Sequence, residues 1–177
     1  MSQQVLVAGI GNIFCTDDGF GSEVARRLGE GPLPDGVRVV DYGIRGMHLA
    51  YDLLDGYAAL VVVDALPGDG PPGELTVLAV GPEDLGEGEF DAHGMAPVAV
   101  LASLGQLGGS LPPTYVVGCR PADVGEGIGL TPSVAAAVGP AIALVHEVLS
   151  DHLGLPTPPS AERTPASVSA QHRKDLP

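Results

Sequence analysis

Short apolar runs alternate along the chain with longer segments in which apolar residues recur every three or four positions. Unbroken apolar runs are typical of strands that are covered on both faces, as in a parallel sheet between helices. Residues 5–9, 59–63 and 114–117 form such runs, and residues 37–41 (VRVVD) are predicted as a further strand. Residues 74–80 alternate more regularly between apolar and polar side chains, which indicates a strand at the edge of the sheet.

The longer segments have the spacing of helices that pack one face against a sheet. In the first of them Phe20, Val24 and Leu28 repeat at every fourth position. Further helices are predicted over residues 46–54 and 97–107, and a last one begins at Thr131-Pro132, a cap residue followed by proline. The alternation predicts an α/β fold: a three-layer α/β/α sandwich on a twisted, mostly parallel sheet of about five strands.

The chain length suits one domain. The 177 residues have a mass of 17.9 kDa, and 45% of them are hydrophobic, which is enough for a sizeable core. From residue 155 the chain is rich in Pro, Ser, Thr and Ala and has no apolar periodicity. We therefore expect a single domain over residues 1–154 and a mobile tail over 155–177.

The charge of the chain excludes several classes of function. Residues 1–154 hold five of the eight basic residues and 20 of the 22 acidic ones, a net charge of −15. Lys174 is the only lysine, so the predicted domain has none for a phosphate-binding loop or a Schiff base. Without a basic face, binding to nucleic acid or to an anionic membrane is not expected. A carboxylate-rich surface instead favours a cation or a basic partner.

Cysteine usage and the N-terminus indicate a cytoplasmic protein. Cys15 and Cys119 are far apart and form no CxxC motif, so a disulfide framework is not expected. The N-terminal residues carry no basic stretch, and their apolar run is too short for a signal peptide or a membrane span.

Three candidate acidic sites follow predicted strands. Asp17 and Asp18 follow the first strand, Asp41 ends the second, and Asp64 ends the third. The carboxyl ends of parallel strands meet at one edge of a sheet, where ligands bind in open α/β folds. One of the two adjacent acids, Asp17 or Asp18, is also expected to cap the helix that follows.

An imidazole can join these acids. His93 lies in a Gly-, Glu- and Asp-rich loop before the third helix. Together with Asp18 and Asp64 it would form a mixed oxygen and nitrogen set suited to a divalent transition metal. Asp18 and Asp64 are alternatively a candidate acid pair for an aspartic-type mechanism, provided that the fold brings them together.

The turn at residues 9–12 also resembles part of a dinucleotide-binding motif. The full motif needs a third glycine where this chain has Phe14, and the acids at Asp17 and Asp18 would repel a pyrophosphate. A nucleotide-binding oxidoreductase is therefore kept only as an alternative, and no organic cofactor is expected.

The block from Gly9 to Gly21 resembles the N-terminal signature of the [NiFe]-hydrogenase maturation endopeptidases. In this family a strand is followed by G-x-G-N, then by D-D/E-G-x-G and a helix. The matching residues are Gly11, Asn12, Asp17, Asp18, Gly19 and Gly21. Later segments fit in the same order: residues 41–46, 63–65, the His93 loop and 129–134.

The resemblance implies an endopeptidase that removes the C-terminal extension of the hydrogenase large-subunit precursor after nickel insertion. The family's metal-contacting positions fall on Asp18, Asp64 and His93, with the nickel supplied by the substrate. Asp18 and Asp64 would also be the catalytic acids. Asp41, Gly43 and Gly46 match a segment that positions the substrate. A non-catalytic, metal-dependent chaperone of the same large subunit would use the same residues and is the second hypothesis.

Overall fold

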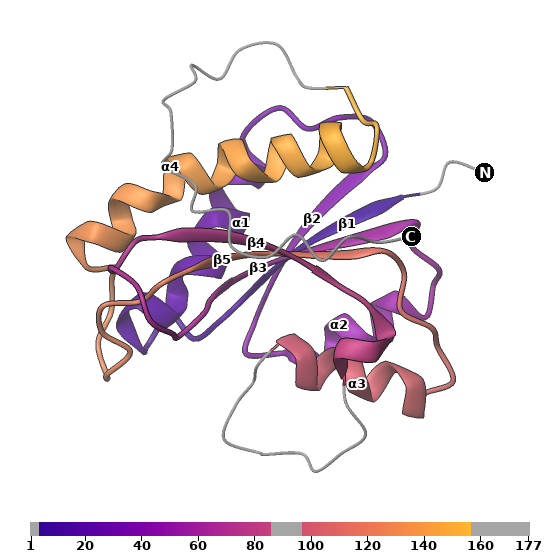
Figure 1. Ribbon diagram of the computed structural model, residues 1–177, viewed down its shortest axis with the longest axis horizontal. Helices are drawn as coiled ribbons and strands as arrows, with labels where there is room; N and C mark the ends of the chain where they lie inside the picture. Colours follow the sequence, from indigo (N-terminus) through magenta and orange to yellow (C-terminus); the bar gives the residue numbers. More distant parts are fainter. Residues whose placement is uncertain (1–3, 86–96, 157–177) are drawn as a thin grey trace.

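Five strands form one sheet in the computed structural model, which describes residues 4–85 and 97–156 (Figure 1). The strands are β1 (Val5–Ile10), β2 (Val37–Gly43), β3 (Ala59–Ala65), β4 (Leu75–Val80) and β5 (Thr114–Cys119). Their order in the sheet is β2-β1-β3-β5-β4. Only β4 is antiparallel to its neighbour, and it lies at the edge of the sheet as predicted.

Helices cover both faces of the sheet. The helices are α1 (Phe20–Glu30), α2 (Gly46–Leu53), α3 (Pro97–Gln106) and α4 (Pro132–Glu147). A 3-10 turn, η1 (Thr16–Gly19), precedes α1; another, η2 (Pro82–Leu85), follows β4; and a π-helical turn (Val148–His152) extends α4. Because α1 and α4 lie on one face and α2 and α3 on the other, the three-layer sandwich is confirmed (Figure 1).

Each face of the sheet has its own hydrophobic core. Along β1, Val5 and Val7 point to the core under α1 and α4, while Leu6, Ala8 and Ile10 point to the core under α2 and α3. All six residues of β1 are buried. An unbroken apolar run therefore corresponds here to a strand that is buried on both faces.

The last helix is apolar because it packs against the core. Within residues 4–85 and 97–156, one helical stretch, Pro132–His152, is long and apolar enough by length and composition to span a membrane. Val134, Val138 and Val145 from this stretch are buried in the core beside α1. Packing inside the domain thus accounts for its composition.

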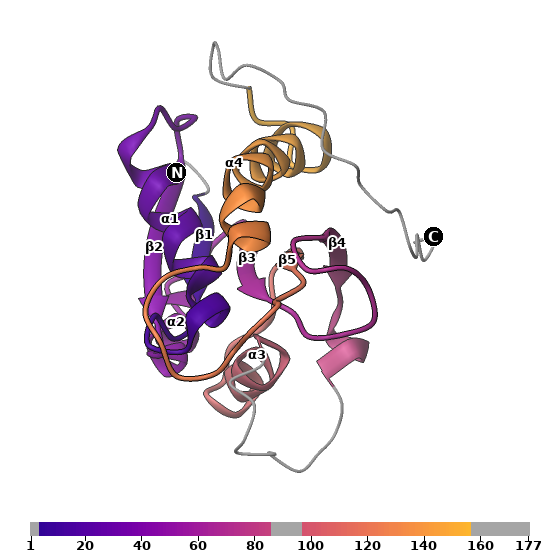
Figure 2. The same cartoon turned by 90° about the vertical axis from the view of Figure 1, so that its left-hand side faces the viewer.

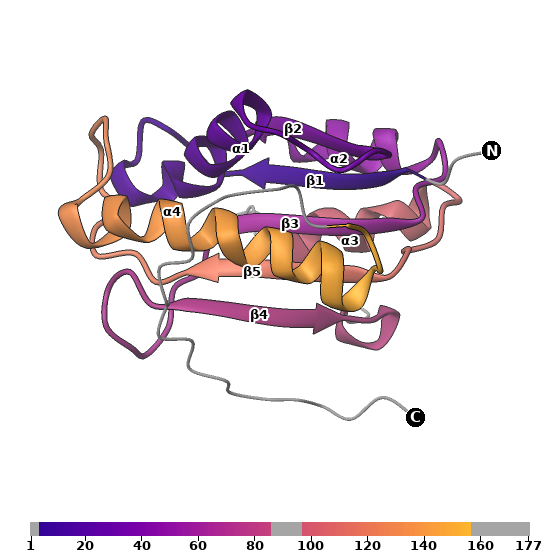
Figure 3. The same cartoon turned by 90° about the horizontal axis from the view of Figure 1, so that it is seen from above.

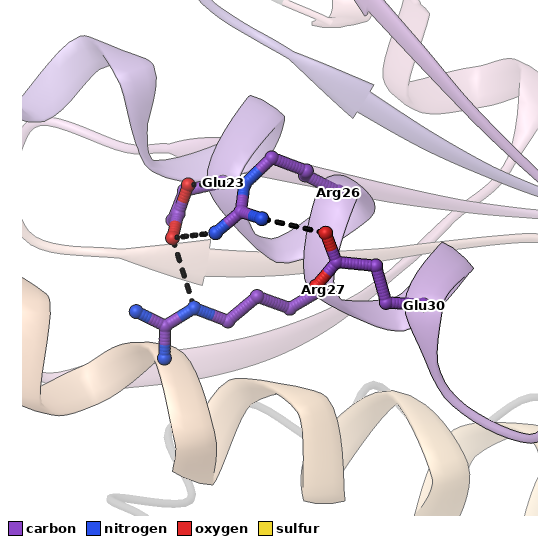
Figure 4. Close-up of polar contacts among 4 residues, drawn as sticks. All are labelled: Glu23, Arg26, Arg27 and Glu30. Carbon is purple, nitrogen blue, oxygen red and sulfur yellow. Dashed lines mark hydrogen bonds and ion pairs between the residues drawn. The ribbon is translucent and has the colours of Figure 1, made fainter.

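The arginines at the end of α1 are engaged on the outer surface of that helix. Arg26 pairs with Glu23 at 2.9 Å and with Glu30 at 2.7 Å, and Arg27 pairs with Glu23 at 2.8 Å (Figure 4). Exposed pairs of this kind contribute little to stability. Two of the five arginines of residues 1–154 therefore pair with acids on the surface of their own helix.

The carboxyl ends of the four parallel strands meet at one edge of the sheet. In Figure 3 the arrows of β1, β3 and β5 point to the same side, where α4 begins. Figure 2 looks onto this edge, and the orange loop between β5 and α4 runs there beside the indigo segment that precedes α1. This edge carries the predicted acids.

Candidate active site

Asp64 lies at the end of β3 and is almost completely buried, with 5% of its surface exposed. Burial raises the pKa of Asp64 to about 8, and the negative charge of Asp18 adds to the rise, while a hydrogen bond from the Ala65 amide opposes it. Near neutral pH this carboxyl therefore holds its proton. A buried acid with such a pKa can donate or accept a proton under physiological conditions.

Asp18 is the second acid of the pair. It lies in η1, and its Oδ2 accepts a hydrogen bond of 2.8 Å from the amide of Asn12. Asn12 also shapes the turn, because its Oδ1 accepts a hydrogen bond from the amide of Phe14. The fold thus brings together the two acids that the sequence places at the ends of different strands, near enough for the charge of Asp18 to act on Asp64.

Two motif glycines make room for this arrangement. Gly11 has a φ of +142°, and a Cβ there would lie 1.8 Å from the carbonyl oxygen of Asp18 and 3.8 Å from Oδ1 of Asp64. A Cβ on Gly21 would lie 2.2 Å from the carbonyl oxygen of Val63. Glycine at these positions lets the turn after β1 fold back and lets α1 approach the ends of β1 and β3.

Asp17 binds the loop between β5 and α4, which is distant in the sequence. Its carboxylate accepts hydrogen bonds from the amides of Ala122, Asp123 and Thr131 and from the Thr131 hydroxyl, at 2.7–3.0 Å. Burial alone would raise the pKa of Asp17, but the bonds from Thr131, Asp123 and Ala122 outweigh it and hold the pKa below its ordinary value. Asp17 therefore organises the loop between β5 and α4.

The prediction that Asp17 or Asp18 caps α1 is wrong. The N-cap of α1 is Gly19, and no side chain caps that helix. The Asp18 carboxylate instead accepts a hydrogen bond from the Asn12 amide. The Asp17 carboxylate accepts hydrogen bonds from amides of the β5–α4 loop. Thr131 is the N-cap of α4, but its hydroxyl binds Asp17 and not its own helix.

The segment after β2 borders the turn that carries Gly11. Asp41 Oδ1 accepts hydrogen bonds from the Ser22 hydroxyl at 2.7 Å and from the Gly43 amide at 2.9 Å. The carbonyl of Gly43 in turn accepts a hydrogen bond from the Gly11 amide at 3.0 Å. Asp41 thus shapes the end of β2 and ties it to α1, next to the turn that separates the two acids.

Gly46 begins α2 and lies where this helix meets α3. A Cβ on Gly46 would lie 2.6 Å from Cγ2 of Val100, so the absence of a side chain allows close contact between the two helices. Its position indicates a packing role, and no hydrogen bond of the described residues links it to the acid pair.

The third predicted metal ligand, His93, lies outside the described residues. Within residues 4–85 and 97–156, no group of three or more His, Cys, Asp or Glu side chains lies close enough to hold a metal ion. Asp18 and Asp64 supply two carboxylate donors, so a complete site would need donors from elsewhere.

Both cysteines are free thiols, as the sequence predicts. Cys119 is buried at the end of β5, where burial, together with the charge of Asp17, raises the pKa of its thiol to about 12. Because the thiolate is the reactive form, Cys119 is not a nucleophile at neutral pH.

A separate open pocket lies beside the β2 edge of the sheet. It has a volume of about 340 Å³ and does not include the acid pair. Tyr42 lines it and donates a hydrogen bond of 2.6 Å to Asp52. The other lining residues are Val40, Arg45, His48 and Tyr51.

Sequence reasoning did not find two features of this edge. The role of Asp17 was missed because its partners lie more than a hundred residues away in the sequence. Asp17 and Asp18 are also the same residue type, so the sequence does not show which of them has which role. The exposed apolar residues on the neighbouring loops, such as Phe14 and Ile128, were also missed. Their signal was available: large apolar residues in loops that are otherwise rich in glycine and acids.

The fold is that of an open α/β protein, and the acid pair lies at the carboxyl ends of its parallel strands, where such folds bind their ligands. The sequence model of the hydrogenase maturation protease family matches residues 22–148. The chain belongs to this family and is a hydrogenase maturation endopeptidase by class.

Individual relatives agree with the family assignment. The hydrogenase 2 maturation protease of Escherichia coli is 31% identical over 153 residues, which cover 84% of this chain and 92% of that protein. The hydrogenase expression/formation protein HupD of Bradyrhizobium diazoefficiens is 32% identical over 155 residues, covering 84% and 79%. The structure of the hydrogenase maturating endopeptidase HybD from E. coli superposes with a TM-score of 0.73 at 30% identity, covering 86% and 95%.

Proposed function

We propose that this endopeptidase removes the C-terminal extension of a [NiFe]-hydrogenase large-subunit precursor in the cytoplasm. The observation that carries the proposal is the acid pair Asp18–Asp64, in which one carboxyl holds a proton near neutral pH. Family membership and the matching fold support the substrate class.

In this proposal, the nickel that the precursor already carries is the recognition element. Asp18, Asp64 and His93 contact this nickel and thereby orient the scissile peptide. Carboxylate oxygens and an imidazole nitrogen are suitable donors for a divalent transition metal. Because Asp64 is protonated near neutral pH, its binding to a cation displaces a proton, so recognition becomes stronger as the pH rises toward 8.

The acids have a second candidate role in the cleavage itself. In an aspartic-type mechanism one acid of the pair is the general base that activates water and the other is the general acid; because Asp64 holds its proton near neutral pH, Asp18 would then be the base and Asp64 the acid. The raised pKa of Asp64 supports a proton transfer at this residue. Asp41 and Gly43 border Gly11 and are proposed to position the substrate chain, together with the segment that ends at Gly46.

The test compares nickel-loaded and nickel-free precursor, with the C-terminal mass of the precursor as the readout. We expect the wild-type protein to shorten only the nickel-loaded form. Equal processing of both forms would reject nickel recognition and leave the protease assignment intact. An unshortened precursor that nevertheless binds the protein would identify a metal-dependent chaperone instead.

Single variants assign the residues. Asp18→Asn, Asp64→Asn and His93→Ala are each expected to reduce processing at least a hundredfold while the fold persists. Asp35→Asn is the matched control, because Asp35 is exposed and lies at the opposite end of the sheet, before β2. Full activity of His93→Ala would remove that residue from the proposed site.

A further inference from the structure

Exposed apolar side chains gather around the acid pair. In the described part of the chain nine large hydrophobic residues are exposed, and five of them lie on loops at the carboxyl ends of the strands. We name these five residues the apolar collar: Ile13, Phe14, Ile44, Val124 and Ile128. Ile128 is 82% exposed and Phe14 is 60% exposed.

We propose that the apolar collar binds apolar side chains of the precursor next to the peptide bond that is cut. The inference rests on the proposed function, because it takes the large-subunit precursor as the substrate. It adds the means of recognition: contact between apolar side chains beside the acid pair.

The collar is carried on a backbone that is held in place. The loops after β1 and β5 pair with each other: the Gly127 amide donates to the Phe14 carbonyl and the Thr16 amide donates to the Gly127 carbonyl, both at 2.9 Å. The Thr16 hydroxyl also donates to the Gly125 carbonyl at 2.8 Å. These bonds hold Thr16 at a φ of +51°, which non-glycine residues rarely adopt. Such preorganised apolar groups bind with little ordering cost.

The collar lies on the path to the acids. Ile13 and Phe14 stand between Asn12, whose amide binds Asp18, and Asp18 itself. Val124 and Ile128 belong to the loop that Asp17 organises (Figure 2). Ile44 follows Gly43, whose carbonyl accepts the Gly11 amide. The collar residues therefore lie on the loops that carry or border the acid pair, where a bound polypeptide can contact them.

The charges near the collar favour an apolar segment over an acidic one. Asp123 and Glu126 lie in the same loop as Val124 and Ile128, and residues 1–154 carry a net charge of −15. An acidic peptide would be repelled there. Arg120 does not offset this charge freely, because its Nη1 donates to the carbonyls of Leu66 and Pro67.

The experiment is a double-mutant cycle between enzyme and substrate. Phe14→Ser and Ile128→Ser are measured against the nickel-loaded precursor and against a precursor whose apolar residues within three positions of the cut are changed to Ser. We expect each enzyme variant to raise KM about tenfold on the natural precursor, with kcat within twofold, since each loses the burial of a large apolar side chain. On the Ser-substituted precursor the same variants should change KM less than twofold.

Leu78→Ser is the matched control, because Leu78 is an exposed apolar residue on β4, away from the collar. It should leave KM unchanged. Equal effects of all three variants, or effects of undiminished size on the Ser-substituted precursor, would overturn the inference. A wild-type dimer that Ile128→Ser dissociates without a change in KM would also overturn it, because the collar would then bind a second copy of the chain.

Binding by the collar can be measured even if the protein does not cut the precursor. If the wild-type protein leaves the precursor uncut, the Kd for the intact precursor replaces KM as the readout. A Kd that Phe14→Ser and Ile128→Ser both weaken about tenfold retains the inference, whereas an unchanged Kd rejects it. Thermal melting should be the same for Phe14→Ser and Ile128→Ser as for the wild type, because these side chains are 60% and 82% exposed.

Discussion

The carboxylate of Asp17 binds Thr131 through both the amide and the hydroxyl, with the amide at 2.7 Å from Oδ1 and the hydroxyl at 2.8 Å from Oδ2. The two residues are 114 positions apart in the sequence. This contact joins the turn after β1 to the start of α4. The same contact therefore holds the turn that carries Asp18 and the loops that carry four residues of the apolar collar.

Replacing Asp17 should destabilise the whole domain. Asp17 is buried, and Asp17→Ala removes the acceptor of three partly buried backbone amides of the β5–α4 loop. Lost hydrogen bonds to a buried charge cost about 1.5–3 kcal/mol each and are not additive, so we expect the free energy of unfolding to fall by about 3 kcal/mol or more. Urea unfolding measures this change. In the same assay Asp35→Ala should shift the free energy by less than about 0.5 kcal/mol, because Asp35 is exposed.

Two glycines of α1 should respond in opposite directions to alanine. A Cβ on Gly21 would lie within 2.2–2.3 Å of the carbonyl oxygens of Val63 and Ile10, so Gly21→Ala should lower the free energy of unfolding by about 3 kcal/mol. Gly29, by contrast, has no atom within 4 Å of the position of a Cβ. Gly29→Ala should therefore raise the free energy by about 0.5–1 kcal/mol through helix propensity. Loss of stability in both variants would contradict the close approach of α1 to the strands.

The contribution of Asp64 to the stability of the metal-free protein should fall as the pH rises from about 4 to about 8. Asp64 has an ordinary pKa of 3.8 in the unfolded chain and a pKa of about 8 in the folded one. Over this interval the folded protein keeps a proton that the unfolded protein releases. Through this proton, rising pH favours unfolding by at most about 1.4 kcal/mol per pH unit.

Asp64→Asn isolates this effect. The amide cannot ionise, so the variant should lack this part of the pH dependence and should be more stable than the wild type at pH 8. Urea unfolding with a chelator present, at several pH values between 4 and 8, compares the two slopes. Parallel curves for the two proteins would show that Asp64 ionises normally in the folded state.

Ending the chain at Pro156 should leave the domain intact. Leu153 and Leu155 pack against the core under α1 and α4, whereas residues 157–177 lie outside the described part. We expect the same melting temperature as for the full chain. A chain that ends at Ser150 lacks both leucines and should melt several degrees lower. A large loss of stability in the chain that ends at Pro156 would show that the tail belongs to the domain.

The fold was predictable because its elements have strong local signals. The runs that became β1 and β3 are buried on both faces, so nearly every position in them is apolar. The more alternating run of β4 identified the edge strand. These signals arise because buried positions are apolar and recur with the side-chain period of each strand or helix.

The site was predictable only in part. Asp18 and Asp64 could be placed together because parallel strands end at one edge. The division of roles between Asp17 and Asp18 depends instead on a 3-10 turn that directs neighbouring side chains to different partners. No local pattern in the sequence reports that turn, and the partners of Asp17 come from the far end of the chain.

The order of strands in the sheet has a consequence for synthesis. β1, β2 and β3 can assemble with α1 and α2 once the first 65 residues have left the ribosome, but β3 gains its second neighbour only with residues 114–119. Until then the nascent chain presents the free edge of β3, whose central residues are Val61, Val62 and Val63. An exposed apolar strand edge is a template for aggregation. Slow translation between β3 and β5 should therefore increase misassembly of this protein, even though its finished fold hides that edge completely.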